Sequence, residues 1–226
     1  MEILPGVYWF NLGASNCCLI AENGMLALVD AGVKRSYPKI IHHIESIGFS
    51  PSQLTHILLT HADIDHVGAA RQLQAISGAK IYASQIAADA LVHGRSSRQI
   101  KAGVFTPVLS WFEGLSDAMQ LTADEILAEG DTLPFLGGLQ VIATPGHTPG
   151  HISFYAPQVK LLFAGDSVST QTDKVLYNRM KIFNWDQEKM KASVHRQHKL
   201  HPEIVTSRHG PVVFEAAGKF PAEKSG

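Results

Sequence analysis

The feature that most constrains this chain is a run of histidines and aspartates directly after an apolar strand-like segment. His56-Ile57-Leu58-Leu59 leads into Thr60-His61-Ala62-Asp63-Ile64-Asp65-His66-Val67-Gly68. A strand that ends in a loop can direct alternate side chains toward one point, and imidazole with carboxylate is a donor set that borderline divalent metals accept. The run therefore predicts a metal site with candidate ligands His61, Asp63, Asp65 and His66. The alternative is a polar loop in which Asp65 caps the next helix before Val67.

Three further polar residues occur in the same context, each in a turn just beyond an apolar strand-like segment. They are His147 after Leu139 to Ala143, Asp166 after Leu161 to Phe163, and His209 after Ile204 to Thr206. In sheet-based enzymes ligands converge at the ends of strands, so the repetition is stronger evidence than any one turn. These residues join the candidate metal ligands.

The pattern of apolar residues predicts an α/β fold. Short strand-like runs open the chain, with Asn-Gly and similar turns between them, and strands then alternate with helices. The expected strands are Val7 to Leu12, Cys17 to Ala21, Met25 to Val29, His56 to Leu59, Lys80 to Ala83, Leu139 to Ala143, His151 to Tyr155, Lys160 to Phe163 and Glu203 to Thr206. The expected helices are Ser36 to Ile47, Val67 to Ile76 and Asp186 to Lys199.

The whole chain, residues 1–226, is expected to form a single domain, or at most two intimately packed halves. Residues 84–129 break the alternation because they mix helical patches with several glycines and a proline. We interpret this stretch as a helical insertion that covers a site. The alternative is an additional helical layer without contact to a substrate.

Composition excludes several function classes. The 19 Lys and Arg nearly balance the 20 Asp and Glu, so no global field would attract nucleic acid or an anionic membrane. Met1 to Phe10 lacks the pattern of a signal peptide, and no run of ~18 apolar residues follows, so a cytoplasmic protein without membrane partner is expected. Cys17 and Cys18 are adjacent, which disfavours a mutual disulfide; we expect buried thiols, with a reactive or metal-binding role as the alternative.

At these residues the chain resembles the metallo-β-lactamase-fold superfamily, whose pattern is His-x-His-x-Asp-His, a Gly-His turn, a Gly-Asp and a late Gly-His. The resemblance extends from Val29-Asp30-Ala31-Gly32 to His209-Gly210-Pro211. It implies a four-layered αβ/βα sandwich that holds two divalent metal ions, with zinc favoured and manganese or iron as alternatives. Carried over by position, the first metal would bind His61, Asp63 and His147, the second Asp65, His66 and His209, and Asp166 would bridge both.

One position departs from the family pattern, because Asp63 stands where a second histidine is usual. Two divalent ions bring four positive charges, which Asp63, Asp65, Asp166 and a bridging hydroxide would cancel. The additional carboxylate should weaken Lewis acidity and shift preference from zinc toward the harder manganese or iron. We therefore predict a site that tolerates more than one metal.

Two residues are expected to support ligands rather than bind metal. His151 lies four residues beyond His147 in a strand-like segment, where a structural or ligand-orienting role is the better interpretation. Asp30 follows the strand Met25 to Val29 and could orient a ligand; capping a turn is the alternative.

The resemblance implies a hydrolase in which metal-bound hydroxide attacks an electrophilic centre and Asp65 orients that hydroxide. We expect a small-molecule ester, lactone or thioester as substrate. The missing secretion signal disfavours a β-lactam, and the balanced charge disfavours an RNA phosphodiester. Two other classes stay open: a di-iron oxidoreductase related to flavodiiron proteins, which carry a Glu where this chain has Asp63, and a metal-binding module without catalysis.

Overall fold

The computed structural model describes residues 1–98, 119–178 and 183–222. By its internal contacts the chain divides into two compact units, Met1–Leu127 and Ala128–Gly226. Each unit contains its own sheet and helices, and each is described by itself.

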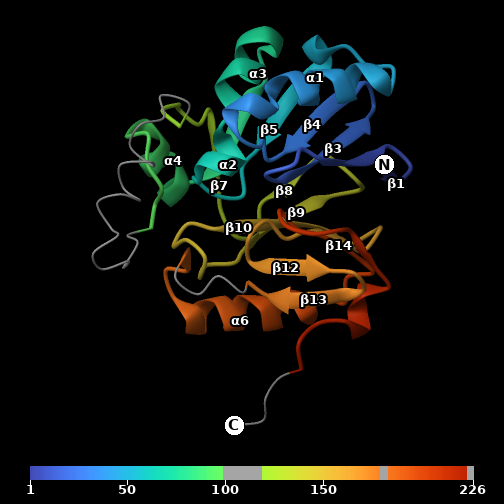
Figure 1. Ribbon diagram of the computed structural model, residues 1–226, viewed down its shortest axis with the longest axis vertical. Coiled ribbons are helices and arrows are strands. Elements are labelled where there is room, and N and C mark those ends of the chain that lie inside the picture. The colour runs from blue at the N-terminus through green and yellow to red at the C-terminus, as the bar shows by residue number, and fades with distance from the viewer. Residues whose placement is uncertain (99–118, 179–182, 223–226) are drawn as a thin grey trace. The chain divides into compact units, whose positions relative to one another are not determined.

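The first unit is built on a seven-stranded sheet whose spatial order follows the chain order (Figure 1). The first three strand pairs are antiparallel, and the last three, from β4 onward, are parallel. The strands are β1 Glu2–Leu4, β2 Val7–Asn11, β3 Asn16–Glu22, β4 Met25–Val29, β5 Leu54–Leu58, β6 Lys80–Ser84 and β7 Glu125–Leu127. In β4, the first strand of the parallel half, Leu26 to Val29 form a buried apolar run, as expected for a strand covered on both faces.

The described residues of the first unit form the α-helices α1 Tyr37–Ser46, α2 Ile64–Val67, α3 Ala70–Ser77 and α4 Gln85–Val92. Figure 1 shows α1 and α3 together over one face of the strands β3 to β5. Ile40 and Ile44, one helical turn apart in α1, are fully buried in the same cluster as Leu28, Ile57 and Leu73. This apolar layer anchors the strand ends at which the predicted ligands begin.

The hairpin between β3 and β4 is closed by Asn23-Gly24, as the sequence predicts. Glu22 pairs with Met25, and both turn residues have positive φ, 51° and 76°. Such a turn matches the twist of the flanking strands but requires residues that tolerate the left-handed region.

Replacing Gly24 by alanine should lower the free energy of unfolding by about 1 kcal/mol. An added Cβ would meet no heavy atom within 4 Å, so the effect comes from the backbone conformation alone. Gly218→Ala is the control, because that site is equally open and its φ is not positive. Urea denaturation measures both variants, and equal stabilities would contradict the assignment of the effect to φ.

The second unit contains a six-stranded sheet in the order β15-β14-β11-β10-β9-β8 and a separate two-stranded ribbon of β12 and β13. The strands are β8 Thr132–Leu133, β9 Leu139–Ala143, β10 Ile152–Ala156, β11 Leu161–Phe163, β12 Val168–Gln171, β13 Lys174–Tyr177, β14 Ile204–Thr206 and β15 Val213–Phe214. Helix α6, Gln187–His198, lies in the crossover between the parallel strands β11 and β14 and contacts β13. The Asp186 side chain caps its first turn by accepting from the N–H groups of Glu188 and Lys189.

The expected elements agree with the observed ones to within a few residues: the second expected helix, Val67 to Ile76, is observed as α3, and the short helix α2 before it was not expected. Six short strands, β1, β7, β8, β12, β13 and β15, were not expected. Within residues 84–129 the structure places α4, and β7 pairs in parallel with β6, so the end of this stretch belongs to the sheet. Residues 99–118 lie outside the described part, and the interpretation of this stretch as a covering insertion stays a prediction.

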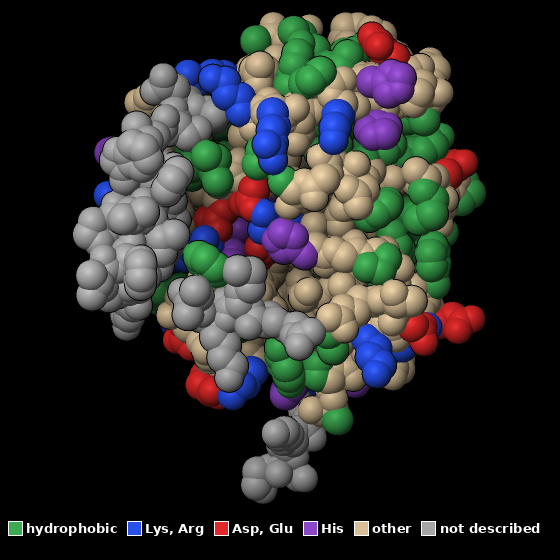
Figure 2. Space-filling view, viewed as in Figure 1, with side chains coloured by type: hydrophobic (Ala, Val, Ile, Leu, Met, Phe, Trp, Pro, Cys, Tyr) green, Lys and Arg blue, Asp and Glu red, His purple; other side chains and the backbone are tan. Residues whose placement is uncertain are grey.

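In the part of the chain that the structure describes, no helix has the length and apolar character to span a bilayer. Figure 2 shows acidic, basic and hydrophobic side chains interspersed over the visible face, in keeping with the balanced charge of the sequence.

Candidate metal centre

In the first unit the predicted ligands follow β5, at the end of a buried parallel strand. His61 and His66 are completely buried and Asp63 is 5% exposed. The loop after β4 is fastened to α2, because Ala31 N–H donates to the His66 carbonyl and Gly68 N–H donates to the Gly32 carbonyl. A Cβ on Gly68 would lie 2.4 Å from the Lys34 backbone nitrogen, so only glycine allows this approach.

Asp30 orients both buried histidines of this unit. Its carboxylate accepts from His66 Nδ1 at 2.7 Å and from the N–H and hydroxyl of Thr60 at 2.9 Å. The single hydroxyl proton of Thr60 is thereby used, so the 3.0 Å contact with His61 Nδ1 requires the imidazole to donate. Both rings therefore carry their proton on Nδ1 and present the Nε2 lone pair, which is the form that binds metals. Asp30 thus orients ligands, as one of the two interpretations from the sequence expected.

Asp63 is held through both carboxylate oxygens. Ser96 Oγ donates to Oδ1 at 2.5 Å, and Arg98 Nη1 lies 2.5 Å from Oδ2. The same Oδ2 lies 3.3 Å from His61 Nε2. Asp63 occupies the N-cap position of α2 without making a capping hydrogen bond, and Asp65 lies in the first turn, half-buried. The alternative in which Asp65 caps the helix is therefore wrong.

The second unit shows a similar arrangement after β9 and β11. His147 and Asp166 are 3% and 2% exposed, and His147 Nε2 lies 3.3 Å from Asp166 Oδ2. The Asn184 side-chain oxygen lies 3.0 Å from His147 Nδ1, so that nitrogen donates and Nε2 presents its lone pair. Arg208 Nη1 lies 3.2 Å from the same Asp166 oxygen.

The two imidazole–carboxylate pairs fit the donor geometry of a tetrahedral metal. Bonds of about 2.0 to 2.1 Å at tetrahedral angles place two ligand atoms roughly 3.3 to 3.4 Å apart. His61 with Asp63 and His147 with Asp166 both show a separation of 3.3 Å. The buried side chains of the described residues that could bind a metal include His61, His147 and Asp166. Each unit thus offers a donor pair that a divalent metal ion would fit.

His151 positions Asp166. Its Nε2 accepts from the Asp166 backbone N–H at 3.0 Å, and its Nδ1 therefore donates to Thr144 Oγ1 at 2.8 Å. With both ring nitrogens engaged in this way, the side chain supports the turn that carries a predicted ligand. This agrees with the structural role expected from the sequence.

His209 follows β14, as predicted, with an exposed side chain. Its carbonyl accepts from Thr170 N–H at 3.1 Å and from Ser207 Oγ at 2.7 Å, which fixes the backbone of the turn. The next residue, Gly210, has a φ of 104°, and a Cβ there would lie 1.9 Å from the Thr170 carbonyl oxygen. The ligand role of His209 stays a prediction.

The sequence interpretation did not include Ser96, Arg98, Asn184 or Arg208. Arg208 could have been found, because it lies next to His209 in a turn after a strand. The other three lie in irregular segments without periodicity or motif, and only the folded chain brings them to the ligands.

Cys17 and Cys18 are buried thiols that form no disulfide, as expected. Burial raises the pKa of the Cys17 thiol well above its usual value, and the charges of Cys18 and Asp30 add to that shift. A thiol with such a pKa stays protonated at neutral pH, which favours the structural interpretation over the reactive one.

Comparisons with known proteins identify a family for this chain. The family model described as the metallo-beta-lactamase superfamily matches residues 10–209. The chain is 37% identical over 153 residues to the uncharacterized protein YobT of Bacillus subtilis (strain 168), a match that covers 67% of the chain but only 61% of YobT. It is 31% identical over 173 residues to the hydroxyacylglutathione hydrolase GloC of Haemophilus influenzae, covering 74% of the chain and 70% of GloC.

Among solved structures, the crystal structure of TTHA1623 in a di-iron-bound form is similar to the chain, with a TM-score of 0.68 and 28% sequence identity. The similarity covers 92% of the chain and 94% of that protein.

Proposed function

Because the chain belongs to the metallo-beta-lactamase superfamily, we propose that it is a metal-dependent hydrolase of a small-molecule ester, lactone or thioester. The predicted resemblance and the α/β fold class are confirmed by the same comparisons. The observation that carries the proposal is the pair of imidazole–carboxylate donor sets, each with a 3.3 Å separation and each with Nδ1 of the histidine already bonded.

The proposed centre holds two divalent metal ions. The ligands are His61, Asp63, Asp65, His66, His147, Asp166 and His209. When bound, such ions would lower the pKa of a coordinated water toward ~7 and so supply a nucleophile at neutral pH. Asp65 would orient the attacking water and accept its proton, while Asp30 and Asn184 hold their histidines in the metal-binding tautomer.

Among the three substrate classes a thioester is favoured. GloC is named a hydroxyacylglutathione hydrolase, and hydrolysis of such a substrate breaks a thioester bond. The metal is proposed to be zinc. Manganese and iron are the alternatives, because one similar structure holds two irons and Asp63 adds a hard oxygen donor.

The test is a panel of a hydroxyacyl thioester, an aryl ester and a lactone, assayed with protein of known metal content. We expect about two metal ions per chain and thioester hydrolysis that a chelator abolishes. His147→Ala should lower kcat/KM by about 1,000-fold or more, since a ligand of the nucleophile-generating centre is lost. His42→Ala, at an exposed position of α1, is the control. Hydrolysis that survives complete removal of metal would refute the proposal.

A di-iron oxidoreductase is the second candidate, favoured by the carboxylate at Asp63 and by the di-iron-bound similar structure. Iron-loaded protein with a chemical reductant would then consume oxygen in repeated turnovers. If it does so while every member of the hydrolysis panel stays intact, the oxidoreductase replaces the hydrolase.

A further inference from the structure

We propose that Arg98 is a positioning residue of the metal centre, whose positive charge compensates the aspartate that stands at position 63. The inference rests on the proposed metal centre and goes beyond it. Arg98 is not one of the proposed ligands, but its charge would allow Asp63 to take the place of the histidine in the family pattern.

Two side chains hold the carboxylate of Asp63. Arg98 and Ser96 bind different oxygens of the carboxylate, both at 2.5 Å, so the carboxylate is fixed in orientation. The oxygen that faces Arg98 is also the one at 3.3 Å from His61 Nε2. A carboxylate oxygen has two lone pairs, and one can bind a guanidinium N–H while the other faces a cation. Arg98 therefore holds Asp63 in a geometry that is compatible with metal binding.

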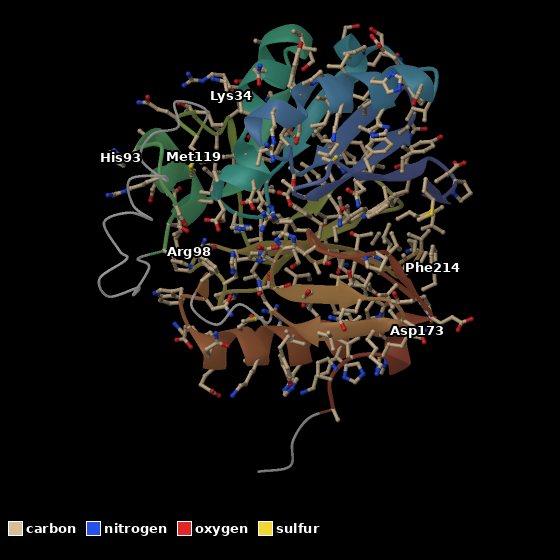
Figure 3. The ribbon with its side chains drawn as sticks, viewed as in Figure 1. Lys34, His93, Arg98, Met119, Asp173 and Phe214 are labelled. Carbon is tan, nitrogen blue, oxygen red and sulfur yellow. The ribbon has the colours of Figure 1, made fainter. Side chains whose placement is uncertain are left out.

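The ion pair between Arg98 and Asp63 is buried. The Arg98 and Asp63 side chains are 9% and 6% exposed, so their charges interact with little screening by water. Figure 3 shows Arg98 beyond the end of α4, in the segment that also contains Ser96. Removing one partner of a buried ion pair leaves an uncompensated charge, which is unfavourable by far more than the same change at the surface.

The Asp63–Arg98 pair has no net charge. A neutral imidazole at position 63 would add no charge, whereas Asp63 adds one negative charge and Arg98 returns one positive charge. The Asp63–Arg98 pair is thus equivalent in net charge to the histidine of the family pattern. The loss of Lewis acidity expected from the Asp63 carboxylate alone is offset by its arginine partner.

The inference predicts that positions 63 and 98 are coupled in metal binding. Asp63→His leaves the Arg98 cation beside a cationic centre, and we expect it to weaken zinc and manganese binding by at least about tenfold. The double variant Asp63→His/Arg98→Gln removes that cation, and its affinity should return to within about threefold of the unmodified protein. Chelator competition measures the dissociation constants, and elemental analysis gives the metal content.

The control and a second measurement keep the test decisive. Arg95→Gln removes a positive charge from an exposed position in the same segment and should leave metal affinity unchanged. In metal-free protein Arg98→Gln should lower the melting temperature by about 5 °C, because Asp63 loses its partner, and Arg95→Gln should not.

The outcomes separate the inference from the proposed function. If the unmodified protein binds no metal, both fail. If it binds metal but Asp63→His and the double variant bind it equally well, only the role of Arg98 is refuted. An Arg98→Gln protein that is as stable as the Arg95→Gln protein without metal would refute the role of Arg98 independently of any metal measurement.

Discussion

Asp30→Asn is expected to lower the affinity for divalent metal ions by about 10- to 100-fold, although Asp30 is not among the proposed ligands. The Asp30 carboxylate accepts three hydrogen bonds, from His66 Nδ1 and from the N–H and hydroxyl of Thr60. An amide has only one acceptor oxygen, and its NH2 group would oppose a donor. His66 would lose the anionic partner that fixes its ring, and Thr60 would no longer be committed to accepting from His61.

Asparagine is the informative replacement because Asp30 has a φ of 59°, a conformation that Asn tolerates and most residues do not. The variant therefore changes the hydrogen bonding while retaining the backbone. Asp124→Asn is the matched control: Asp124 also accepts from a backbone N–H, that of Ile81 at 2.8 Å, but is exposed and has no contact with the predicted ligands in the described residues.

Chelator competition on folded protein measures both variants. An Asp30→Asn protein that unfolds at the same denaturant concentration as the Asp124→Asn protein and binds metal as tightly as the unmodified chain would show that orientation of His66 is unimportant.

That the candidate ligands lie just beyond strand ends could be predicted, because the strands themselves are readable in the sequence. The strands β5, β9, β11 and β14 are short segments rich in Leu, Ile and Val, which the sequence displays directly, and polar residues after them mark the strand ends at which ligands are expected. The supporting role of Asp30 could also be predicted, because Asp30 follows β4, the parallel neighbour of β5.

The partners of the ligands could not be predicted, because they depend on the conformation of irregular segments. Ser96 lies 33 residues from Asp63 and Asn184 lies 37 residues from His147. Neither is in a helix or strand whose periodicity would assign it a direction. The prediction for Asp63 was accordingly incomplete: its charge was expected to act on the metals without a compensating cation, whereas the structure pairs it with Arg98. The strands β8 and β15 were missed because two residues carry no alternation.

Gly146→Ala is expected to destabilise the protein by about 3 kcal/mol or more, by overpacking combined with backbone strain. Gly146 precedes His147 and has a φ of 144°. A Cβ at this position would lie 2.3 Å from the Cα of Met190, in the backbone of α6. The turn and the helix are also joined by hydrogen bonds, since Asp186 N–H donates to the Gly146 carbonyl and Trp185 N–H donates to the His147 carbonyl.

Gly130→Ala separates the two causes. Gly130 has a φ of 89° in the same unit, but an added Cβ there meets nothing within 4 Å, so only about 1 kcal/mol of conformational cost is expected. The difference between the two variants in urea denaturation therefore measures the close approach of α6 to the Gly-His turn. Because the clash must be relieved by moving that turn or the helix, the same substitution should displace His147 from Asn184 and weaken metal binding. Equal losses of stability in the two variants would mean that α6 moves away from the added Cβ at no cost in free energy. The position of His147 would then have to be fixed by Asn184 and Trp185 instead.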